Sequence, residues 1–407
     1  VFNHSGIPFW AFQDVKENGL NSEFVDWFEI LKFDDKSSIE NEFDYEGWAG
    51  IKDLPVYKDI EGLYHPKLME YFKNIVKRWM DPNNDGNPED GIDGWRLDVA
   101  EHVNIKFWRE FRMWVDEINP NAYLTGEVWW ENFWDNEMIN AEPWLRGDSF
   151  HGVMNYRLAD ALFKFFIDDK KKITATEFKG LLENMISDYG YDNFLNVQNV
   201  LGSHDTERIS SACINPDRWI DHANHLKYNP EFKVRRPNEE ERKLQELVVT
   251  FQFLFPGTPY VFYGDEVGIW GADDPDCRKP MIWDEFKYED EKAHSQNLNR
   301  SIDKVEIEYD VKEFYKYLIG VRSSFNCLQS GDFKINLADN ETGLFAFTRS
   351  LGNNSITAVF NGSNSKINYQ FEELSFLKDN CEYIDLNNHE PFNMIEHKSF
   401  HIWVCHE

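Results

Sequence analysis

Apolar positions recur with two periods along most of the chain, one typical of helices and one typical of strands. A helical period begins at Pro66, and the apolar side chains that follow it at this spacing are Leu68, Phe72, Ile75, Val76 and Trp79. A second helical stretch covers residues 104–119, where Asn104 is a residue type that caps helices. Short apolar runs typical of buried strands lie at 94–99, 122–129, 151–156, 194–205 and 259–264. Strands that alternate with helices predict an α/β fold with a parallel sheet, preceded by a strand-like stub at residues 1–4.

The pattern changes after residue 328, and the change predicts a second domain. Strand-like runs separated by Asn, Gly and Ser are typical of an all-β module, and they lie at 333–337, 343–350, 354–362 and 399–405. Two other stretches, 5–62 and 264–310, show no regular period, which is typical of functional loops. We therefore expect domains at 1–328 and 329–407, with 5–62 as a long loop insertion in the first.

The bulk composition excludes several classes of protein. A length of 407 residues predicts two or three domains, and a net charge of −31 argues against nucleic acid, whose phosphates attract basic surfaces. No apolar run is long enough for a transmembrane helix, so we expect no membrane partner. The five cysteines are scattered without a C-x-x-C pair, which predicts neither a disulfide framework nor a zinc site.

Charged side chains interrupt the strand-like run at 94–99. Because side chains alternate between the two faces of a strand, Arg96 and Asp98 share a face. This pair by itself fits a structural ion pair as well as a functional one. Two more carboxylates, Glu127 and Asp205, also lie at or near the ends of strand-like runs, where parallel α/β barrels build their active sites. The three together favour a catalytic role.

Retaining glycoside hydrolysis needs such a set of carboxylates. One must stay ionised to attack the anomeric carbon, and Arg96 favours the ionised form of Asp98. Another must hold a proton for the leaving oxygen, and the apolar neighbours of Glu127 favour its protonated form. The two carboxyl groups should lie roughly 5–5.5 Å apart if the configuration is retained. Asp205 would then stabilise positive charge on the sugar, and His204 would bind its hydroxyl groups.

Tryptophans gather after Glu127, at positions 129, 130, 134 and 144. Core packing and a stacking platform for sugar rings both fit this group. Trp129 is our candidate from it for substrate binding.

Five segments resemble, in order and spacing, the conserved segments of the α-amylase superfamily: VFNHSG (1–6), DGWRLDVAEH (93–102), TGEVWW (125–130), VLGSHDTER (200–208) and PGTPYVFYGDEVG (256–268). Four further segments resemble the cyclomaltodextrinase and neopullulanase branch: FQDVKENGLNSEFVDWFEI (12–30), MNYRLADAL (154–162), SHDTER (203–208) and DDPDCRKPMIW (273–283). The resemblance covers nearly the whole chain.

The resemblance implies a (β/α)8 (TIM) barrel followed by a β-sandwich domain. It implies Asp98 as nucleophile, Glu127 as acid/base and Asp205 as stabiliser of the transition state. It also implies five residues that bind the substrate: His4, Arg96 and His204 at the cleavage site, and Asp274 and Arg278 beyond it.

Three departures from the family pattern limit these expectations. The Asp that opens the first family segment is absent before Val1, so we expect the chain to lack the first two barrel strands. The expected protein partner is then either a second copy of the chain, in a homodimer, or a missing N-terminal portion of the same protein. The second departure is LPVYKD (54–59), which stands where the branch usually has Pro-Lys-Leu-Asn. The third is His102, which stands where ordinary α-amylases, and not this branch, keep a His.

A possible metal site is the stretch DPNNDG at 81–86. Asp81, Asn83 and Asp85 match the front half of a calcium loop, but the twelfth position is Ile92 instead of Glu. A structural calcium ion and a plain Asx-rich turn both remain open. Asn3 resembles a calcium ligand of the family, and no organic cofactor is expected.

The leading hypothesis is an enzyme that hydrolyses α-1,4-glucosidic bonds in cyclomaltodextrins, pullulan or linear maltodextrins, with some transglycosylation. Its partners would be α-glucan oligosaccharides. The alternatives are an ordinary α-amylase or α-glucosidase and, from another class, a non-catalytic sugar-binding relative or an inactive fragment. A bacterial cytoplasmic location and a periplasmic or secreted one are equally open.

Overall fold

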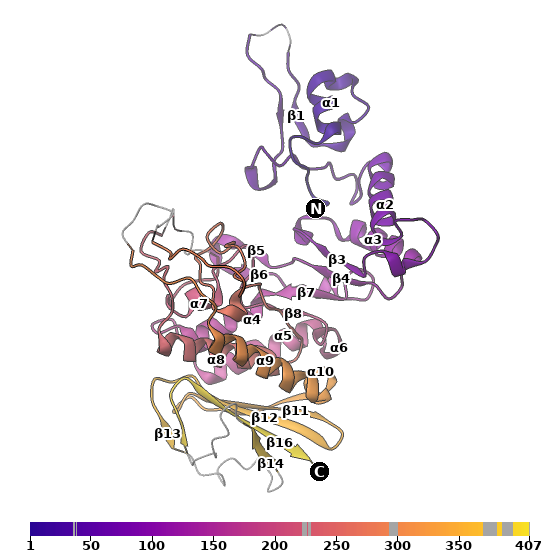
Figure 1. Ribbon diagram of the computed structural model, residues 1–407. Helices are drawn as coiled ribbons and strands as arrows, with labels where there is room; N and C mark the ends of the chain where they lie inside the picture. The colour runs from indigo at the N-terminus through magenta and orange to yellow at the C-terminus, as the bar shows by residue number, and fades with distance from the viewer. Residues whose placement is uncertain are drawn as a thin grey trace. The chain divides into compact units, whose positions relative to one another are not determined.

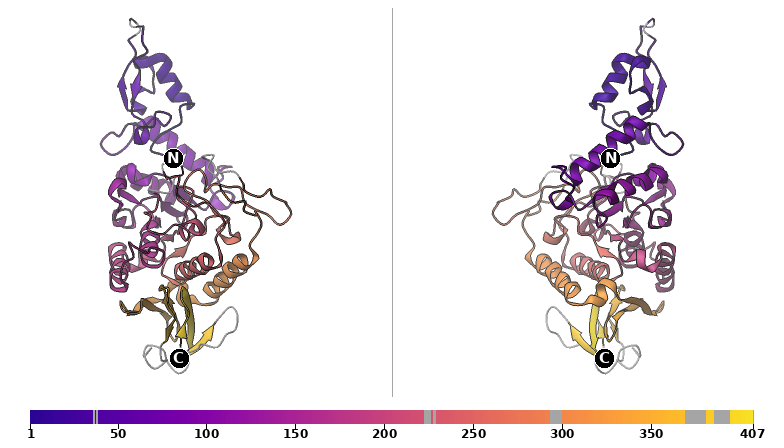
Figure 2. Two further views of the ribbon diagram at one scale, coloured as in Figure 1. Left: turned by 90° about the vertical axis from the view of Figure 1, so that its left-hand side faces the viewer. Right: turned by 90° about the vertical axis from the view of Figure 1, so that its right-hand side faces the viewer.

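The chain forms two compact units in a computed structural model. Unit 1 comprises Val1–Trp130 and Ile139–Met154, and unit 2 comprises Glu131–Met138 and Asn155–Glu407. The structure describes residues 1–35, 37, 39–221, 226, 229–292, 300–368, 381–384 and 394–406. Figure 1 labels the helices and strands, and Figure 2 gives two further views of them.

Unit 1 contains parallel strands in the order β3–β4–β7, with bounds β3 (Gly94–Leu97), β4 (Tyr123–Gly126) and β7 (Gly152–Asn155). Its longer helices are α2 (Pro66–Met80) and α3 (Ile105–Ile118), which contact each other. An aromatic core joins them, because the Phe2 ring lies 5.0 Å from Phe72 on α2 and 5.1 Å from Phe111 on α3. The predicted alternation of strands and helices is therefore present here.

The two helices begin and bury side chains much as their sequences indicate. Asn104 caps α3 by accepting a hydrogen bond from the amide of Lys106, as predicted. On α2 the buried side chains are Leu68, Phe72, Val76 and Met80. The prediction for Trp79 was wrong, since its side chain is 58% exposed. The helical step of four residues from Val76 leads to Met80 and turns Trp79 outward.

The segment 5–62 is more regular than the sequence indicated. It contains α1 (Trp10–Asn18) and an antiparallel pair of strands, β1 (Ile30–Lys32) and β2 (Asp44–Tyr45). The remaining elements of unit 1 are single turns: η1 (Gly19–Asn21), η2 (Val25–Trp27), η3 (Trp48–Gly50), η4 (Pro88–Asp90), η5 (Ala100–His102) and η7 (Glu142–Trp144).

Unit 2 contains the longest helices and a second pair of parallel strands. Its helices are α4 (Tyr156–Leu162), the π-helical η8 (Phe163–Ile167), α5 (Ala175–Tyr189), α6 (Tyr191–Phe194), α7 (Ile209–Ala212), α8 (Glu239–Leu254), α9 (Tyr309–Ser324) and α10 (Asn326–Ser330). Its parallel strands are β8 (Gln198–Asn199) and β9 (Thr258–Pro259), so the strand predicted at 259–264 is much shorter. A hairpin is formed by β5 (Trp130–Asn132) and β6 (Glu137–Met138), with η6 (Phe133–Asp135) between them. The predicted loop at 264–310 contains η9 (Asp265–Val267), and its residues 293–299 lie outside the described part.

The C-terminal part of unit 2 is antiparallel, as the change of pattern predicted. A five-stranded sheet has the order β10–β11–β12–β16–β14, with bounds β10 (Asp332–Ala338), β11 (Leu344–Leu351), β12 (Asn354–Asn361), β16 (Ser399–His406) and β14 (Cys381–Ile384). A smaller pair is formed by β13 (Ile367–Asn368) and β15 (Met394–Ile395). Phe251 on α8 packs against this sheet, with its ring 5.2 Å from Phe347 and 5.0 Å from Phe360. Figures 1 and 2 show α8 beside α9, and α8 also contacts β16.

One pair of cysteines forms a disulfide that the sequence did not indicate. Cys381 on β14 faces Cys405 on β16 in the antiparallel register, and the two are bonded. Cys213, Cys277 and Cys327 are free and buried. The spacing of 24 residues between the bonded cysteines carried no signal, because strand pairing brings them together.

Two predictions about the architecture stay predictions. The described residues place parallel strands in both units, but they do not test whether two barrel strands are missing or whether the domains divide at residue 328. Among the described residues, no helix is long and apolar enough to cross a membrane.

Candidate active site

Asp98 and Glu127 leave neighbouring strands of unit 1 at the same edge of the sheet. The parallel register pairs Leu97 at the end of β3 with Gly126 at the end of β4, and each carboxylate is the next residue. The Glu127 amide donates to the Leu97 carbonyl at 2.9 Å, and the Ala100 amide donates to the Glu127 carbonyl at 2.9 Å. The sheet ladder thus continues one step past the strand ends and fixes the backbone of Glu127.

A single guanidinium contacts both carboxylates. Arg96 Nη1 donates to Asp98 Oδ1 at 2.5 Å, and Nη2 donates to Glu127 Oε1. The sequence predicted the contact with Asp98, but the contact with Glu127 was missed. Because a planar guanidinium holds two acceptors in fixed directions, Arg96 orients the two carboxyl groups relative to each other.

The turn after Asp98 is strained and points its amide at Glu127. Val99 has φ 49° and ψ 42°, a left-handed conformation that is unfavourable for a β-branched residue. Its amide donates to Glu127 Oε2 at 2.9 Å, and Glu127 is only 5% exposed. Both oxygens of Glu127 therefore have partners, and strain of this kind is typical of functional sites.

Gly126 permits the close packing behind Glu127. A Cβ atom at this position would lie 2.3 Å from Cε2 of Phe150, well inside normal contact distance. The glycine therefore allows the Phe150 ring to approach the strand end, where it limits movement of the residue that follows.

His4 lies in a network of side chains near the N-terminus of unit 1. Its Nδ1 lies 3.1 Å from Asn3 Oδ1, and its ring stacks on Trp48 with 5.5 Å between centroids. Trp48 in turn donates to His102 Nδ1 at 2.7 Å. Burial lowers the pKa of His4, an effect that the charge of Asp98 opposes, and burial also lowers the pKa of His102. Both rings are therefore suited to bind hydroxyl groups as neutral imidazoles.

Trp48 was missed by the sequence reasoning. It lies in a segment without a regular period, so no pattern marked it as a neighbour of His4. The signal that could have found it is a lone Trp within a polar stretch that contains two glycines. Asn3 uses its amide nitrogen to donate to the His102 carbonyl at 3.1 Å, so its side chain supports this network at both ends.

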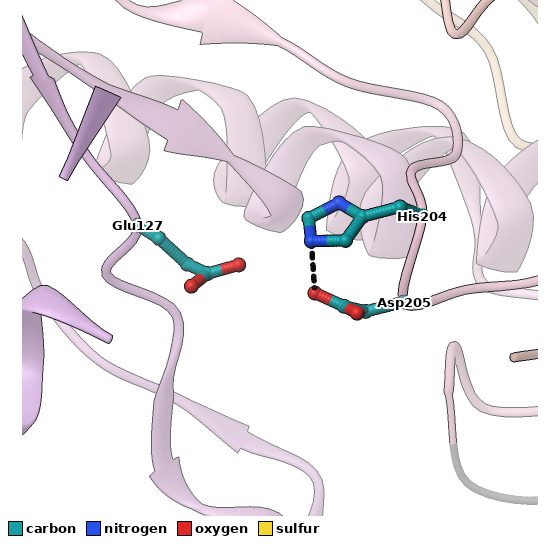
Figure 3. Close-up of side chains that lie close together, drawn as sticks. All are labelled: Glu127, His204 and Asp205. Atoms are coloured by element: carbon teal, nitrogen blue, oxygen red, sulfur yellow. Dashed lines mark ion pairs between the residues drawn. The ribbon is translucent and has the colours of Figure 1, made fainter. Parts of the chain in front are cut away.

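Within unit 2, four further residues that the sequence predicted to be functional lie together. His204 Nε2 lies 3.0 Å from Asp205 Oδ2, the ion pair drawn as a dashed line in Figure 3. Arg278 Nη2 donates to Asp205 Oδ1 at 2.8 Å, and Arg278 Nε donates to the His204 carbonyl at 2.7 Å. Arg278 also forms an ion pair with Asp274 at 3.1 Å. The side chain of Asp205 is 32% exposed, so this group is open to solvent.

The tryptophans after Glu127 do not share one environment. Trp129 is 9% exposed, and its ring lies 4.9 Å from that of Trp130, whereas Trp134 at the hairpin turn is 81% exposed. Substrate binding by Trp129 stays a prediction.

The candidate calcium loop is held by hydrogen bonds of its own. Asp81 accepts from the amides of Asp85 and Gly86 at 3.0 and 3.2 Å, and Asn83 Oδ1 accepts from the Asp85 amide at 2.8 Å. These are the contacts of an Asx-rich turn. Carboxylate oxygens of Asp81, Asp85 and Asp90 nevertheless lie within 4.8 Å of one another, and Asp90 was missed.

A family model for the catalytic domain of α-amylase matches residues 1–331, which include all the candidate catalytic residues above. The chain belongs to the α-amylase family. The resemblance stated from the five segments is thereby confirmed.

Relatives within the α-amylase family agree with this assignment. A cyclomaltodextrinase of Geobacillus thermopakistaniensis is 34% identical over 364 residues, covering 89% of this chain and 50% of that protein. Neopullulanase 2 of Thermoactinomyces vulgaris is 34% identical over 368 residues, covering 90% of this chain and 51% of that protein. A solved cyclomaltodextrinase structure has a TM-score of 0.67 at 32% identity and covers 90% of this chain and 51% of that one. The chain therefore spans about half the length of these curated relatives.

Proposed function

We propose that this chain carries the catalytic residues of a retaining glycoside hydrolase that cleaves α-1,4-glucosidic bonds. Cyclomaltodextrins, pullulan and linear maltodextrins are the proposed substrates, with transglycosylation as a side reaction. The observation that carries the proposal is Arg96, which binds both Asp98 and Glu127 at the edge of the sheet. The names of the relatives support the substrate class.

In the proposed first step, Asp98 attacks the anomeric carbon and Glu127 gives a proton to the leaving oxygen. A covalent glycosyl-enzyme forms, and the bond to the leaving sugar breaks. Both oxygens of Glu127 accept hydrogen bonds in the structure, from Arg96 and from the Val99 amide. A protonated oxygen donates instead, so this step requires Glu127 to release one of these contacts to the leaving oxygen.

In the proposed second step, Glu127 takes a proton from water, and the water attacks the anomeric carbon to release Asp98. Glu127 begins this step in its ionised form, which can accept both hydrogen bonds, from Arg96 and from the Val99 amide. Asp205, which is bound by Arg278 and His204, stabilises positive charge on the sugar in both transition states. A sugar hydroxyl in place of water would give transglycosylation.

An ordinary α-amylase acting on starch is the second candidate. The observation that favours it is His102, which stands where those enzymes keep a His and contacts Trp48 next to His4. The two candidates differ in substrate preference: the first would open cyclomaltodextrin rings, and the second would attack linear chains.

Calcium at residues 81–90 is a separate proposal. The convergence of three carboxylates supports it, because like charges at this distance favour a cation between them. The hydrogen bonds from the loop amides to Asp81 weigh against it, because they hold the turn without an ion. If calcium binds, Asp81, Asp85 and Asp90 would hold it as a structural ion.

The test is the release of reducing sugar from β-cyclodextrin, pullulan and soluble starch by the protein and by its Asp98→Asn variant. Faster cleavage of β-cyclodextrin than of starch, with the variant inactive, would support the proposal. Faster cleavage of starch would support the second candidate. Binding of these glucans without any cleavage by the folded protein would support the non-catalytic alternative and refute both.

A further inference from the structure

Two buried hydroxyl groups are linked by hydrogen bonds to the backbone of Asp205, and the mechanism above does not use them. Tyr156 is the first residue of α4, and Ser203 lies between β8 and Asp205. Tyr156 OH donates to Ser203 Oγ at 3.0 Å, and Ser203 Oγ accepts from the Asp205 amide at 3.1 Å. Tyr156 is 1% exposed and Ser203 is fully buried, and all three residues belong to unit 2. These hydrogen bonds thus connect the start of a helix to the residue that carries a candidate catalytic carboxylate.

The turn that contains Asp205 is held by two side-chain hydroxyl groups. Ser203 Oγ accepts from the Asp205 amide, and Thr206 Oγ1 accepts from the Ser203 amide at 2.9 Å. Thr206 is also fully buried, and its hydroxyl donates to the Glu207 carbonyl at 3.2 Å. Because a serine hydroxyl has two acceptor positions, the Tyr156 hydroxyl and the Asp205 amide fill both positions of Ser203. The turn is therefore fixed by buried groups whose hydrogen bonds are already made.

The peptide group between His204 and Asp205 is held at both of its ends. Its amide donates to Ser203 Oγ, and its carbonyl accepts from Arg278 Nε at 2.7 Å. Because a peptide group is planar, these two contacts fix its orientation and so the direction in which the Asp205 side chain leaves the backbone. The Asp205 side chain itself is 32% exposed. A carboxylate that faces a sugar cannot be enclosed by protein on that side, so its position depends on the backbone that carries it.

We propose that Ser203, supported by Tyr156, is a positioning residue for Asp205. The two hydroxyl groups fix the Asp205 backbone, so that the carboxylate is in place when positive charge develops on the sugar. A purely structural pair could be replaced by apolar groups of the same shape at little cost in stability. The stabilising role of Asp205 itself rests on the proposed function. Loss of the pair should therefore weaken binding of the transition state more than binding of the substrate.

Two variants remove the hydrogen bonds in steps. Ser203→Ala removes the acceptor of both bonds, whereas Tyr156→Phe removes only the donor to Ser203 and leaves the bond to the Asp205 amide. Tyr191→Phe is the matched control, because the Tyr191 hydroxyl on α6 donates to the Gly331 carbonyl. The control thus loses a comparable hydrogen bond of unit 2 that does not involve the turn.

In the whole protein, Ser203→Ala is expected to lower kcat for maltodextrin by about 10-fold and Tyr156→Phe by about threefold, since a small shift of a positioned group has an effect of this order. KM should stay within about twofold for both variants, because both side chains are buried. The Kd of 1-deoxynojirimycin, a sugar-shaped cation, should rise by the same factor as kcat falls, whereas the Kd of maltose should not change. Tyr191→Phe should alter none of these values.

A double-mutant cycle with Asp205→Asn tests whether Ser203 acts through Asp205. The substrate is α-maltosyl fluoride, because its leaving group needs no proton and keeps slow variants measurable. Ser203→Ala should lower kcat by about 10-fold when Asp205 is present, but by less than about twofold in the Asp205→Asn variant. A purely structural role would give the same loss in both backgrounds.

The same loss in both backgrounds, no loss from Ser203→Ala, or an equal rise in Kd for 1-deoxynojirimycin and maltose would overturn the proposal. If the Asp205→Asn variant is too slow to measure, the two Kd values decide. If Ser203→Ala does not fold, Tyr156→Phe must show the same dependence on Asp205. Absence of activity on maltodextrin and the fluoride in the unmodified protein would instead refute the proposed function, which keeps the two failures distinct.

Discussion

The two units hold their candidate catalytic carboxylates in different ways. In unit 1, backbone amides of the sheet edge and its turns contact Glu127, which is almost fully buried. In unit 2, the Asp205 carboxylate is bound by the side chains of Arg278 and His204 and is partly open to solvent. In the first arrangement, strand register places the backbone amides and Arg96 adds one side-chain contact, whereas the second arrangement depends on long side chains. We therefore expect unit 1 to tolerate fewer substitutions than unit 2.

The largest effect is expected from Glu127→Gln, which removes the proton donor but keeps the shape of the side chain. Hydrolysis of maltodextrin should fall by about 10⁴-fold or more, as for other essential catalytic groups. Hydrolysis of α-maltosyl fluoride should fall far less in its first step, because fluoride needs no proton. Burst kinetics with the fluoride measure that step separately. Maltodextrin hydrolysis above a hundredth of the normal rate would remove Glu127 from the mechanism.

A pair of matched variants tests the comparison between the units directly. Lysine presents one charged atom and so cannot span two carboxylates as arginine does. Arg96→Lys should therefore lower kcat by about 100-fold, because Arg96 joins the proposed nucleophile to the proposed acid/base. Arg278 also contacts two carboxylates, but its side chain is 43% exposed and neither Asp205 nor Asp274 is the proposed nucleophile or acid/base, so Arg278→Lys should lower kcat by only about 10-fold. Arg109→Lys, at the surface pair with Asp148, is the control and should change nothing. Equal losses for Arg96 and Arg278 would contradict the difference between the units.

A smaller effect is expected in the dependence of stability on pH. Burial raises the folded pKa of Glu101 in η5 to about 8, above its ordinary value of 4.5, so the folded state holds this proton more tightly than the unfolded chain. The contribution of Glu101 to the free energy of unfolding is therefore present below pH 4.5 and is lost as pH rises through 8. Glu101→Gln should remove this loss, which we expect to be about 1–3 kcal/mol.

Thermal unfolding at pH 5 and pH 8 measures this change. The Gln variant should unfold at a higher temperature than the unmodified protein at pH 8, and at nearly the same temperature at pH 5. A variant that is less stable at pH 8 would show that the Glu101 carboxyl is not protonated in the folded state.

The smallest effect is expected from calcium. If the ion binds Asp81, Asp85 and Asp90, chelation should lower Tm by a few degrees, because a surface turn contributes little to a large protein. Asp90→Asn should remove that difference without changing Tm in chelator, since Asp90 is not needed for the turn hydrogen bonds of Asp81. An unchanged Tm for the unmodified protein with and without calcium would show that residues 81–90 form only an Asx-rich turn and no calcium site.

The sequence was informative where short-range periodicity determines the position of a residue and the face on which it lies. Asp98, Glu127 and Asp205 could be found because they follow strand-like runs, and Arg96 because strand alternation places it on the face of Asp98. The contact between Arg96 and Glu127 could not, since it depends on the register that pairs Arg96 with Thr125. Trp48 was missed for a related reason, because tertiary packing brings it to its partners. Trp79 was misplaced because a helical pattern determines a face only to within one residue.

The bond between Cys381 and Cys405 has a practical consequence for anyone who prepares this protein. Of its five cysteines, three are free and buried, and two are joined across neighbouring strands. Denatured material that has never met a reductant should thus react with three equivalents of a thiol reagent, and reduced material with five. The number of thiols that react therefore reports whether β14 and β16 have paired correctly. This measurement is an inexpensive check on each batch before any kinetic work begins.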